Sequence, residues 1–235
     1  MSVLLAIDTA TQACSAALMV DGETRQEITL EPRSHTRLLL PMVDKLLADA
    51  DLSPSQLDAI AYTAGPGSFT GLRIGFGVVQ GLAFACDLPV IAVSSLHTLA
   101  VGAQRQLPVS EGMVVIPAFD ARMSEVYWGA YQTTAAQPKT IAEDCLTSPE
   151  EVAMNIANIF PAENLVGVGE GWHLAQQFPL QPGAIHESLY PEAIDALSLA
   201  AANMDAAVAV EQAQLFYLRD TVSWKKRERL RPAKV

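Results

Sequence analysis

Apolar runs separated by polar turn residues organise the first half of the chain. Five of these runs predict strands, at residues 3–8, 13–20, 24–30, 57–63 and 89–93. Asp21-Gly22, between the second and third runs, is a strong hairpin signal. Apolar residues at helical spacing predict three helices, at about 35–50, 70–85 and 95–105. The later strands, which are joined by helices, should pair in parallel and be covered on both faces.

The same order of elements restarts near residue 113. Four further strands are predicted, at 113–119, 125–131, 140–146 and 165–168, and the residues from Ser148 carry a helix-start signature that predicts a helix over 148–160. The first strand of each half ends in a similar tetrapeptide, AIDT at 6–9 and AFDA at 118–121. We interpret the chain as two related α/β lobes, residues 1–106 and residues 107–235.

Composition and charge narrow the class of protein. Half of the residues are apolar and only 17% are charged, which permits a large buried core. Three widely spaced cysteines and an N-terminal apolar run that soon meets Asp8 favour a cytoplasmic protein with neither a signal peptide nor a membrane span. The net charge of −11 disfavours nucleic-acid binding over the whole surface. Residues 225–235 are instead strongly basic, and form either a solvated tail or an arm for RNA or an acidic partner.

The stretch AGPGSFTGLRIG, residues 64–75, leads from a predicted strand into a glycine-rich helix. On a helical projection Gly71 and Gly75 fall on one side, and Gly77 and Gly81 fall on a well-separated side. Bulky apolar residues occupy most of the remaining circumference, so the helix must be buried on more than one side. The helix at 35–50 is also broadly apolar, and together the two exceed what one sheet face should cover. The glycines therefore predict a docking surface for helices of a partner. A phosphate-binding loop is disfavoured because no lysine follows.

Candidate ligand-binding residues lie at the ends of the first strands of the two halves. Asp8 with Thr9, and Asp120, would face one another across a cleft between the lobes, and Gly169 would let a nucleotide approach the backbone. Carboxylate oxygens there would suit a nucleotide phosphate with Mg²⁺, whereas the alternative is that both aspartates only cap turns. No two of the four histidines have helical metal-site spacing, and motifs of serine hydrolases and P-loops are missing from the sequence. The sequence therefore gives little support to an enzyme.

Several stretches together resemble the TsaB (YeaZ) family: AIDTAT, SHTRLLLPMVDKLL, GPGSFTGLRIG, FDARMSEVYW and FYLRDTVSWKK. The resemblance spans essentially the whole chain. It implies two ribonuclease-H-like lobes of the actin, sugar-kinase and Hsp70 ATPase fold. It further implies a non-catalytic subunit that dimerises with TsaD, the enzyme that forms threonylcarbamoyladenosine beside the tRNA anticodon, and that an ATPase, TsaE, joins the pair. The metal-binding H-x-x-x-H motif of TsaD has no counterpart here.

The resemblance also implies where partners bind. The docking surface maps to the helices at about 35–50 and 70–85, with candidate residues His35, Leu38, Leu39, Met42, Leu46, Arg73, Ile74, Gly75, Gly77, Val78, Gly81 and Phe84. The isolated chain would homodimerise, and ATP or ADP with Mg²⁺ is a candidate cofactor at an interface of the complex. Contact with tRNA is expected through the complex, with Lys225, Lys226 and Arg227 as candidate residues. The alternative function is an ATP-dependent enzyme of this fold or a glycoprotease-like peptidase.

Overall fold

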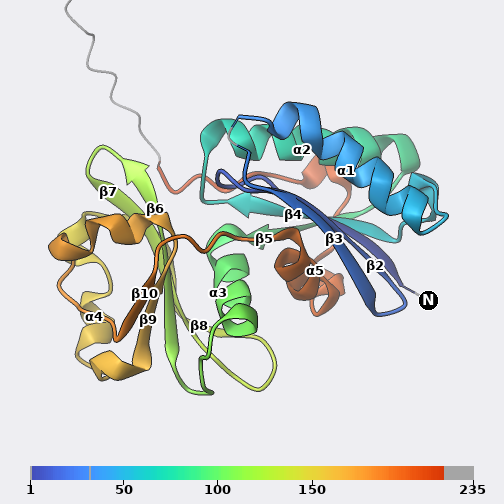
Figure 1. The fold of residues 1–235 in the computed structure, drawn as a ribbon. Helices are drawn as coiled ribbons and strands as arrows, with labels where there is room; N and C mark the ends of the chain where they lie inside the picture. Colours follow the sequence, from blue (N-terminus) through green and yellow to red (C-terminus); the bar gives the residue numbers. More distant parts are fainter. Residues whose placement is uncertain (1, 32, 220–235) are drawn as a thin grey trace, which may run out of the picture.

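The computed structural model describes residues 2–31 and 33–219, which form two five-stranded mixed sheets (Figure 1). The first sheet contains β1 (Val3–Asp8), β2 (Cys14–Val20), β3 (Glu23–Thr29), β4 (Ala59–Gly65) and β5 (Val90–Ser94), in the order β3-β2-β1-β4-β5. β1, β2 and β3 pair antiparallel, whereas β4 runs parallel to β1 and β5 runs parallel to β4. The predicted hairpin and the predicted parallel strands are confirmed.

The second sheet repeats this arrangement. It contains β6 (Val114–Arg122), β7 (Glu125–Gln132), β8 (Lys139–Thr147), β9 (Leu165–Val168) and β10 (Ala184–His186), in the order β10-β9-β6-β7-β8. β6, β7 and β8 pair antiparallel, and β9 and β10 continue the sheet in parallel on the other side of β6. Identical strand order and direction in both sheets is the arrangement expected of a duplicated unit.

Helices cover both faces of the first sheet (Figure 1). The described residues contain five α-helices: α1 (His35–Asp49), α2 (Phe69–Cys86), α3 (Ser95–Gln106), α4 (Met154–Ala157) and α5 (Ala193–Ala201). α1 and α2 pack on one face over a core that includes Leu5, Leu39 and Val79, and α5 packs on the other face. α3 lies between the two sheets and contacts strands of both.

The prediction of a single helix over 148–160 is wrong. The helix-start signature is real, because Ser148 and Glu151 form a capping box, but that box closes only a 3₁₀ turn at Pro149–Glu151. Ala153 follows in the left-handed region at φ 52°, where the chain bends, and α4 comprises only four residues. Val152 and Ala153 are fully buried, so tertiary packing overrides the local helical preference.

The predicted division into residues 1–106 and 107–235 separates the two sheets, but it misplaces the C-terminal segment. α5 lies on the first sheet, and Val208 then forms an antiparallel bridge with Val90 of β5. Farther on, the Phe216 N–H donates to the Ala64 carbonyl at 2.8 Å. Residues 193–217 thus complete the body of the first sheet, because β5 and the α5-facing side of that sheet have apolar surface to cover.

Two clusters of polar side chains connect α3 to other elements, one near each end of the helix. Arg105, near its C-terminus, donates to both carboxylate oxygens of buried Asp195, at 2.8 and 2.9 Å, and to Glu192 at 2.9 Å. At its N-terminus, Ser94 donates to Asp144 of β8, and so does the hydroxyl of Tyr131. Both Asp195 and Asp144 are thereby supplied with donors in buried surroundings, which a buried carboxylate requires.

Candidate partner-binding face and a buried aspartate

The glycines of α2 divide into two classes by what surrounds them. A side chain on Gly71 would collide with the Thr9 carbonyl oxygen, and one on Gly75 would collide with the Thr9 hydroxyl oxygen. The Thr9 hydroxyl also donates to the Gly71 carbonyl at 2.8 Å. At Gly77 and Gly81, by contrast, no atom lies within 4 Å of where a Cβ would be. The predicted separation of the two pairs is confirmed, and only the second pair faces outward.

The residues that open α2 form a tight, close-packed turn. Gly65 has φ +127°, and a Cβ there would lie 2.5 Å from the Phe216 carbonyl oxygen. Ser68 is the N-cap, and its hydroxyl accepts from the Gly71 N–H at 3.2 Å. These glycines therefore allow the chain to pass close to the β1–β2 loop and to the C-terminal segment.

An apolar face of α1 and α2 is turned to solvent. We call this the outer face, and define it by Leu38, Met42, Arg73, Ile74, Gly77, Val78, Gly81 and Phe84. Phe84 is 74% exposed, and the other large apolar members of the outer face are half-buried. Only 28% of α2 is buried although its mean hydropathy is 1.4. Exposed apolar surface of this kind is typical of an interaction site.

By length and composition alone, α2 could cross a membrane, and it is the one such helix among the described residues. Its inner side, however, is built into the protein. Leu72, Val79 and Ala83 are buried, and α2 packs against β4 and β1. A core helix gives the same compositional signal, so the signal is weak evidence for a membrane.

Four residues proposed for the interface lie on the inner side instead. Leu39 and Leu46 are buried in the core beneath α1, and His35 is buried with its Nε2 at 3.1 Å from the Thr11 carbonyl oxygen. Gly75 packs against Thr9. Their assignment to a partner interface is corrected, because an α-helix resting on a sheet turns one side away from solvent. The remaining residues proposed there, including Arg73, are exposed or half-buried.

Asp8, at the end of β1, is completely buried. Neither of its carboxylate oxygens has a hydrogen-bond partner of regular geometry among the described residues, and the same is true of the Thr63 hydroxyl on the adjacent strand β4. Burial raises the pKa of Asp8 to about 7, and the nearby Thr63 hydroxyl and Ala10 N–H oppose part of the rise. Asp8 is thus a carboxyl group held in surroundings that favour its neutral form.

The proposed nucleotide pocket is not assembled from its four residues. Asp8 and Thr9 are buried, and Gly169 is packed so that a Cβ would lie 2.6 Å from the Ala118 carbonyl oxygen. Asp120 is engaged by Arg122, whose backbone N–H and guanidinium donate at 2.7 and 2.9 Å. None of the four lines the cavity beside Gly81 and Phe84 or the one beside Leu30 and Tyr190. Their burial and engagement therefore do not fit a nucleotide with Mg²⁺ at this place.

A serine, a histidine and an aspartate also come together at the N-terminus of α3. Ser94 caps α3 and accepts from the His97 N–H at 3.0 Å, while its hydroxyl donates to Asp144. The His97 ring does not pair with Ser94; its Nε2 lies 2.8 Å from the Pro138 carbonyl oxygen, and the ring stacks on Tyr131. Burial lowers the pKa of His97 and raises that of Asp144. The cluster lacks the serine–histidine contact of a hydrolase triad.

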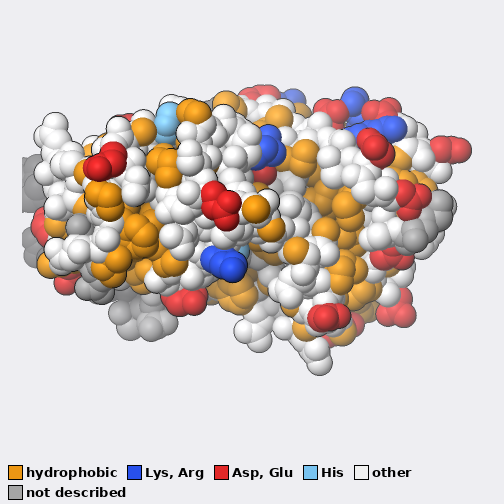
Figure 2. Space-filling view, turned by 90° about the horizontal axis from the view of Figure 1, so that it is seen from below, with side chains coloured by type: hydrophobic (Ala, Val, Ile, Leu, Met, Phe, Trp, Pro, Cys, Tyr) orange, Lys and Arg blue, Asp and Glu red, His pale blue; other side chains and the backbone are white. Residues whose placement is uncertain are grey.

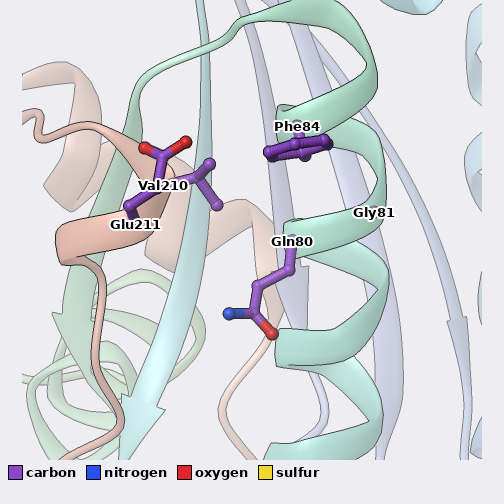
Figure 3. Close-up of a pocket in the computed structure, with 5 residues that line it drawn as sticks. All are labelled: Gln80, Gly81, Phe84, Val210 and Glu211. Carbon is purple, nitrogen blue, oxygen red and sulfur yellow. The ribbon is translucent and has the colours of Figure 1, made fainter.

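Sequence reasoning missed the contribution of the C-terminal segment to the outer face. Val210 and Glu211 lie beside Gln80, Gly81 and Phe84, and these five residues line a cavity of about 340 Å³ (Figure 3). At the other end of α2, the guanidinium of Arg73 stacks 3.3 Å from the centre of the Phe69 ring and 5.1 Å from that of Tyr217. No local pattern places residues so far apart in the sequence together.

The candidate RNA-contact residues Lys225, Lys226 and Arg227 lie outside the described residues. The last described residue, Arg219, forms an ion pair with Glu125 at 2.5 Å and donates to the Ala121 carbonyl at 3.1 Å. The chain therefore leaves the described part next to the turn between β6 and β7.

Comparisons with known proteins agree with one another. Residues 27–220 match the family described as TsaD, tRNA N6-adenosine threonylcarbamoyltransferase. The chain is 42% identical to the tRNA threonylcarbamoyladenosine biosynthesis protein TsaB of Escherichia coli, over 95% of this chain and 97% of that protein. It is 37% identical to the protein of the same name from Haemophilus influenzae, over 95% and 96%.

A solved structure shows the same likeness in three dimensions. The structure of YeaZ from Pseudomonas aeruginosa superposes with a TM-score of 0.86 at 44% sequence identity, and the match covers 93% of this chain and all of that one. A second structure, described as an uncharacterized protein with similarity to peptidase YeaZ from the same organism, matches to the same extent. With relatives this similar over nearly their whole length, the chain belongs to the TsaB (YeaZ) family.

Proposed function

We propose that this chain is a non-catalytic subunit required to form threonylcarbamoyladenosine next to the anticodon of tRNA, and that it acts by dimerising with a TsaD-like catalytic subunit. The observation that carries the proposal is the outer face of α1 and α2, an apolar surface with two open glycines. Membership of a family whose named members are biosynthesis proteins for this modified nucleoside supports the pathway. The repeated strand order supports two ribonuclease-H-like lobes of the actin, sugar-kinase and Hsp70 ATPase fold.

The outer face is suited to a helix of another protein. Gly77 and Gly81 are one turn apart on α2, with nothing above them, so a second helix can approach the backbone closely. Half-buried Ile74 and Val78 and exposed Phe84 flank them and offer apolar area. In the isolated chain the same face would remain uncovered, which favours a homodimer until the catalytic subunit takes its place.

The proposal extends to the other components of the complex. A TsaE-like ATPase joins the pair, and an adenine nucleotide with Mg²⁺ is held at an interface of the complex, since Asp8 and Thr9 are buried within this chain. Figure 2 views the side opposite α1 and α2, where acidic side chains are spread widely and basic ones are sparse. Contact with tRNA is therefore made through the complex, with the basic residues 225–227 as the one contribution from this chain. Such a complex works in the cytoplasm.

The test is to block the outer face without disturbing the core. Gly81→Leu and Gly77→Leu are expected to prevent association with the TsaD-like protein, because an interface packed on glycine has no room for an isobutyl group. Both variants should melt at or above the temperature of the unmodified chain, since the new side chain meets open space in the monomer and raises helix propensity. Light scattering with and without the partner, beside thermal melting, measures both. Association at full strength in both variants would disprove the proposed face.

A second expectation follows for nucleotide chemistry. The isolated chain should hydrolyse ATP no faster than background, because neither Asp8 nor Thr9 is reachable from solvent and Asp120 is paired with Arg122. Steady-state phosphate release by the purified chain is the measurement. Turnover that is abolished by Asp120→Ala would favour the ATP-dependent enzyme over the scaffold.

A further inference from the structure

Three planar side chains gather at the N-terminal end of α2. The Arg73 guanidinium lies 3.3 Å from the centre of the Phe69 ring and 5.1 Å from that of Tyr217, and the two ring centres are 6.2 Å apart. Phe69 is 65% exposed, Tyr217 is 46% exposed, and Arg73 is exposed as well. We call these three residues the stacking platform. Aromatic surface that is left open to water in this way is typical of a binding site.

The stacking platform is held in place by the backbone around it. Next to Tyr217, the Phe216 N–H donates to the Ala64 carbonyl at 2.8 Å, which ties the C-terminal segment to the end of β4. The Arg73 side chain donates to the Phe69 carbonyl at 3.1 Å, which keeps the guanidinium over the ring. A ligand that stacks on the platform therefore meets groups that are already arranged, and less conformational entropy is lost on binding.

Positive charge is available at the platform and close to it in the sequence. Arg73 forms no ion pair with any residue in the described ranges. Arg219 follows Tyr217 by two residues, and the sequence continues to residues 225–235, which contain six basic residues and one acidic residue. Six residues span at most about 22 Å, so Lys225 begins this basic stretch within that distance of Arg219. In a chain of net charge −11, it is the strongest concentration of positive charge.

This combination of planar groups and positive charge matches the chemistry of single-stranded RNA. Every base has a flat face that stacks on an aromatic ring or on a guanidinium, and only an unpaired base has that face free. The phosphates on either side of the base are neutralised by basic residues. A purely apolar protein surface would instead bury Arg73 without a counter-charge, which is unfavourable. The platform therefore favours RNA over an apolar protein surface.

We propose that the stacking platform binds an unpaired base of an RNA loop, and that the basic residues after Arg219 contact the phosphates beside that base. The inference rests on the proposed function for the identity of the RNA as tRNA. It goes beyond that function, which gives this chain only the basic residues 225–227 as RNA contacts. Phe69 lies about 12 Å along the helix axis from Gly77, so the platform is at the edge of the outer face and a helix seated on the open glycines leaves it accessible.

Binding of two RNA probes to the full chain, measured by fluorescence anisotropy, tests the site. One probe is a short hairpin with an unpaired loop, and the other is a blunt duplex with the same number of phosphates. The chain should bind the hairpin more tightly than the duplex. Phe69→Ala and Tyr217→Ala are each expected to weaken hairpin binding about tenfold and to leave duplex binding unchanged, because each removes a stacking surface. Neither removes a charge, so the salt dependence should stay the same.

Four further variants separate stacking from charge and from effects on folding. Ile159→Ala is the matched control, since Ile159 is as exposed as Phe69 and lies in the second half; both affinities should be unchanged. Tyr217→Phe retains the ring and should bind like the unmodified chain. Arg73→Lys keeps the charge but loses the plane, so it should weaken hairpin binding alone. Truncation after Trp224 should flatten the salt dependence for both probes and retain the preference for the hairpin. Thermal melting of each variant checks the fold.

The outcomes separate this inference from the proposed function. Equal affinity for the two probes, no hairpin binding by the chain or by its complex with the TsaD-like protein, or platform variants that behave like Ile159→Ala would each overturn the inference. If Phe69→Ala and Tyr217→Ala weaken association with the TsaD-like protein and spare RNA binding, the platform binds a protein and the inference is wrong as well. The proposed function is tested separately by Gly81→Leu, whose effect on association does not depend on the RNA probes.

Discussion

Asp8→Asn is expected to raise the free energy of unfolding by roughly 4 kcal/mol at pH 8 and to change it little at pH 4. The carboxyl group of Asp8 is buried without a hydrogen-bond partner of regular geometry among the described residues, and burial raises its pKa from 3.8 to about 7. Below pH 3.8 the group is neutral in both the folded and the unfolded chain, so it imposes no penalty. Between pH 3.8 and 7 the unfolded chain ionises first, and stability falls as pH rises.

Above about pH 7 the group is ionised in both states, and the full penalty of a buried charge remains. Asparagine has nearly the same shape and stays neutral, so it removes that penalty without removing volume. Urea unfolding of the two proteins at pH 4, 6 and 8 measures the difference. Asp120→Asn is the control at the corresponding strand end of the second sheet, where the pairing with exposed Arg122 is worth less than about 1 kcal/mol. A gain at Asp8 that does not depend on pH would mean that the buried carboxyl is not the cause.

Gly71→Ala is expected to destabilise the chain by about 2 kcal/mol or more, although alanine is the better helix former. The added methyl group would lie under 3.0 Å from the Thr9 carbonyl oxygen, a backbone atom that cannot rotate away. Helix α2 would have to lift off the β1–β2 loop, and the bond from the Thr9 hydroxyl to the Gly71 carbonyl would lengthen. That bond and the contact of Gly75 with Thr9 hold the helix at its present distance.

Gly77→Ala is the matched control, since the same change on the same helix meets open space. It should stabilise the chain by up to about 1 kcal/mol through helix propensity alone. Chemical denaturation of both variants, monitored by circular dichroism, gives the two values. Equal effects of the two substitutions would show that the inner and outer sides of α2 are not packed differently.

Most of the secondary structure could be predicted because the local signals are strong. The strand at 165–168 and the helix at about 95–105 are found within one residue of their predicted limits. Apolar runs bounded by turn residues and capping side chains depend only on neighbours in the sequence. The prediction of a helix over 148–160 was wrong because local signals take no account of tertiary packing. The burial of Val152 and Ala153, and not the capping box, decides the conformation there.

The candidate site was predicted in part. A helical projection separates Gly71 and Gly75 from Gly77 and Gly81 without a structure, but it cannot tell which pair meets Thr9. That choice depends on how α2 is rotated on its sheet, and the wrong choice placed Gly75 at the interface. The burial of Asp8 likewise depends on α5, far away in the sequence, which covers the side of the first sheet that Leu4, Ala6 and Asp8 face. The wall of the cavity formed by Val210 and Glu211 depends on a chain reversal that no local pattern encodes.

The return of residues 193–217 to the first sheet has a consequence for biosynthesis. The ribosome finishes β5 at Ser94, yet the segment that pairs with that strand and fills the adjoining face ends only at about Phe216. At 5–20 residues per second, roughly 6 to 25 seconds pass between those two points. Throughout that interval the nascent polypeptide exposes an unpaired strand edge, which is the feature that nucleates aggregation. The first sheet can therefore complete its packing only after the second half has been made, and we expect the emerging chain to benefit from a ribosome-associated chaperone.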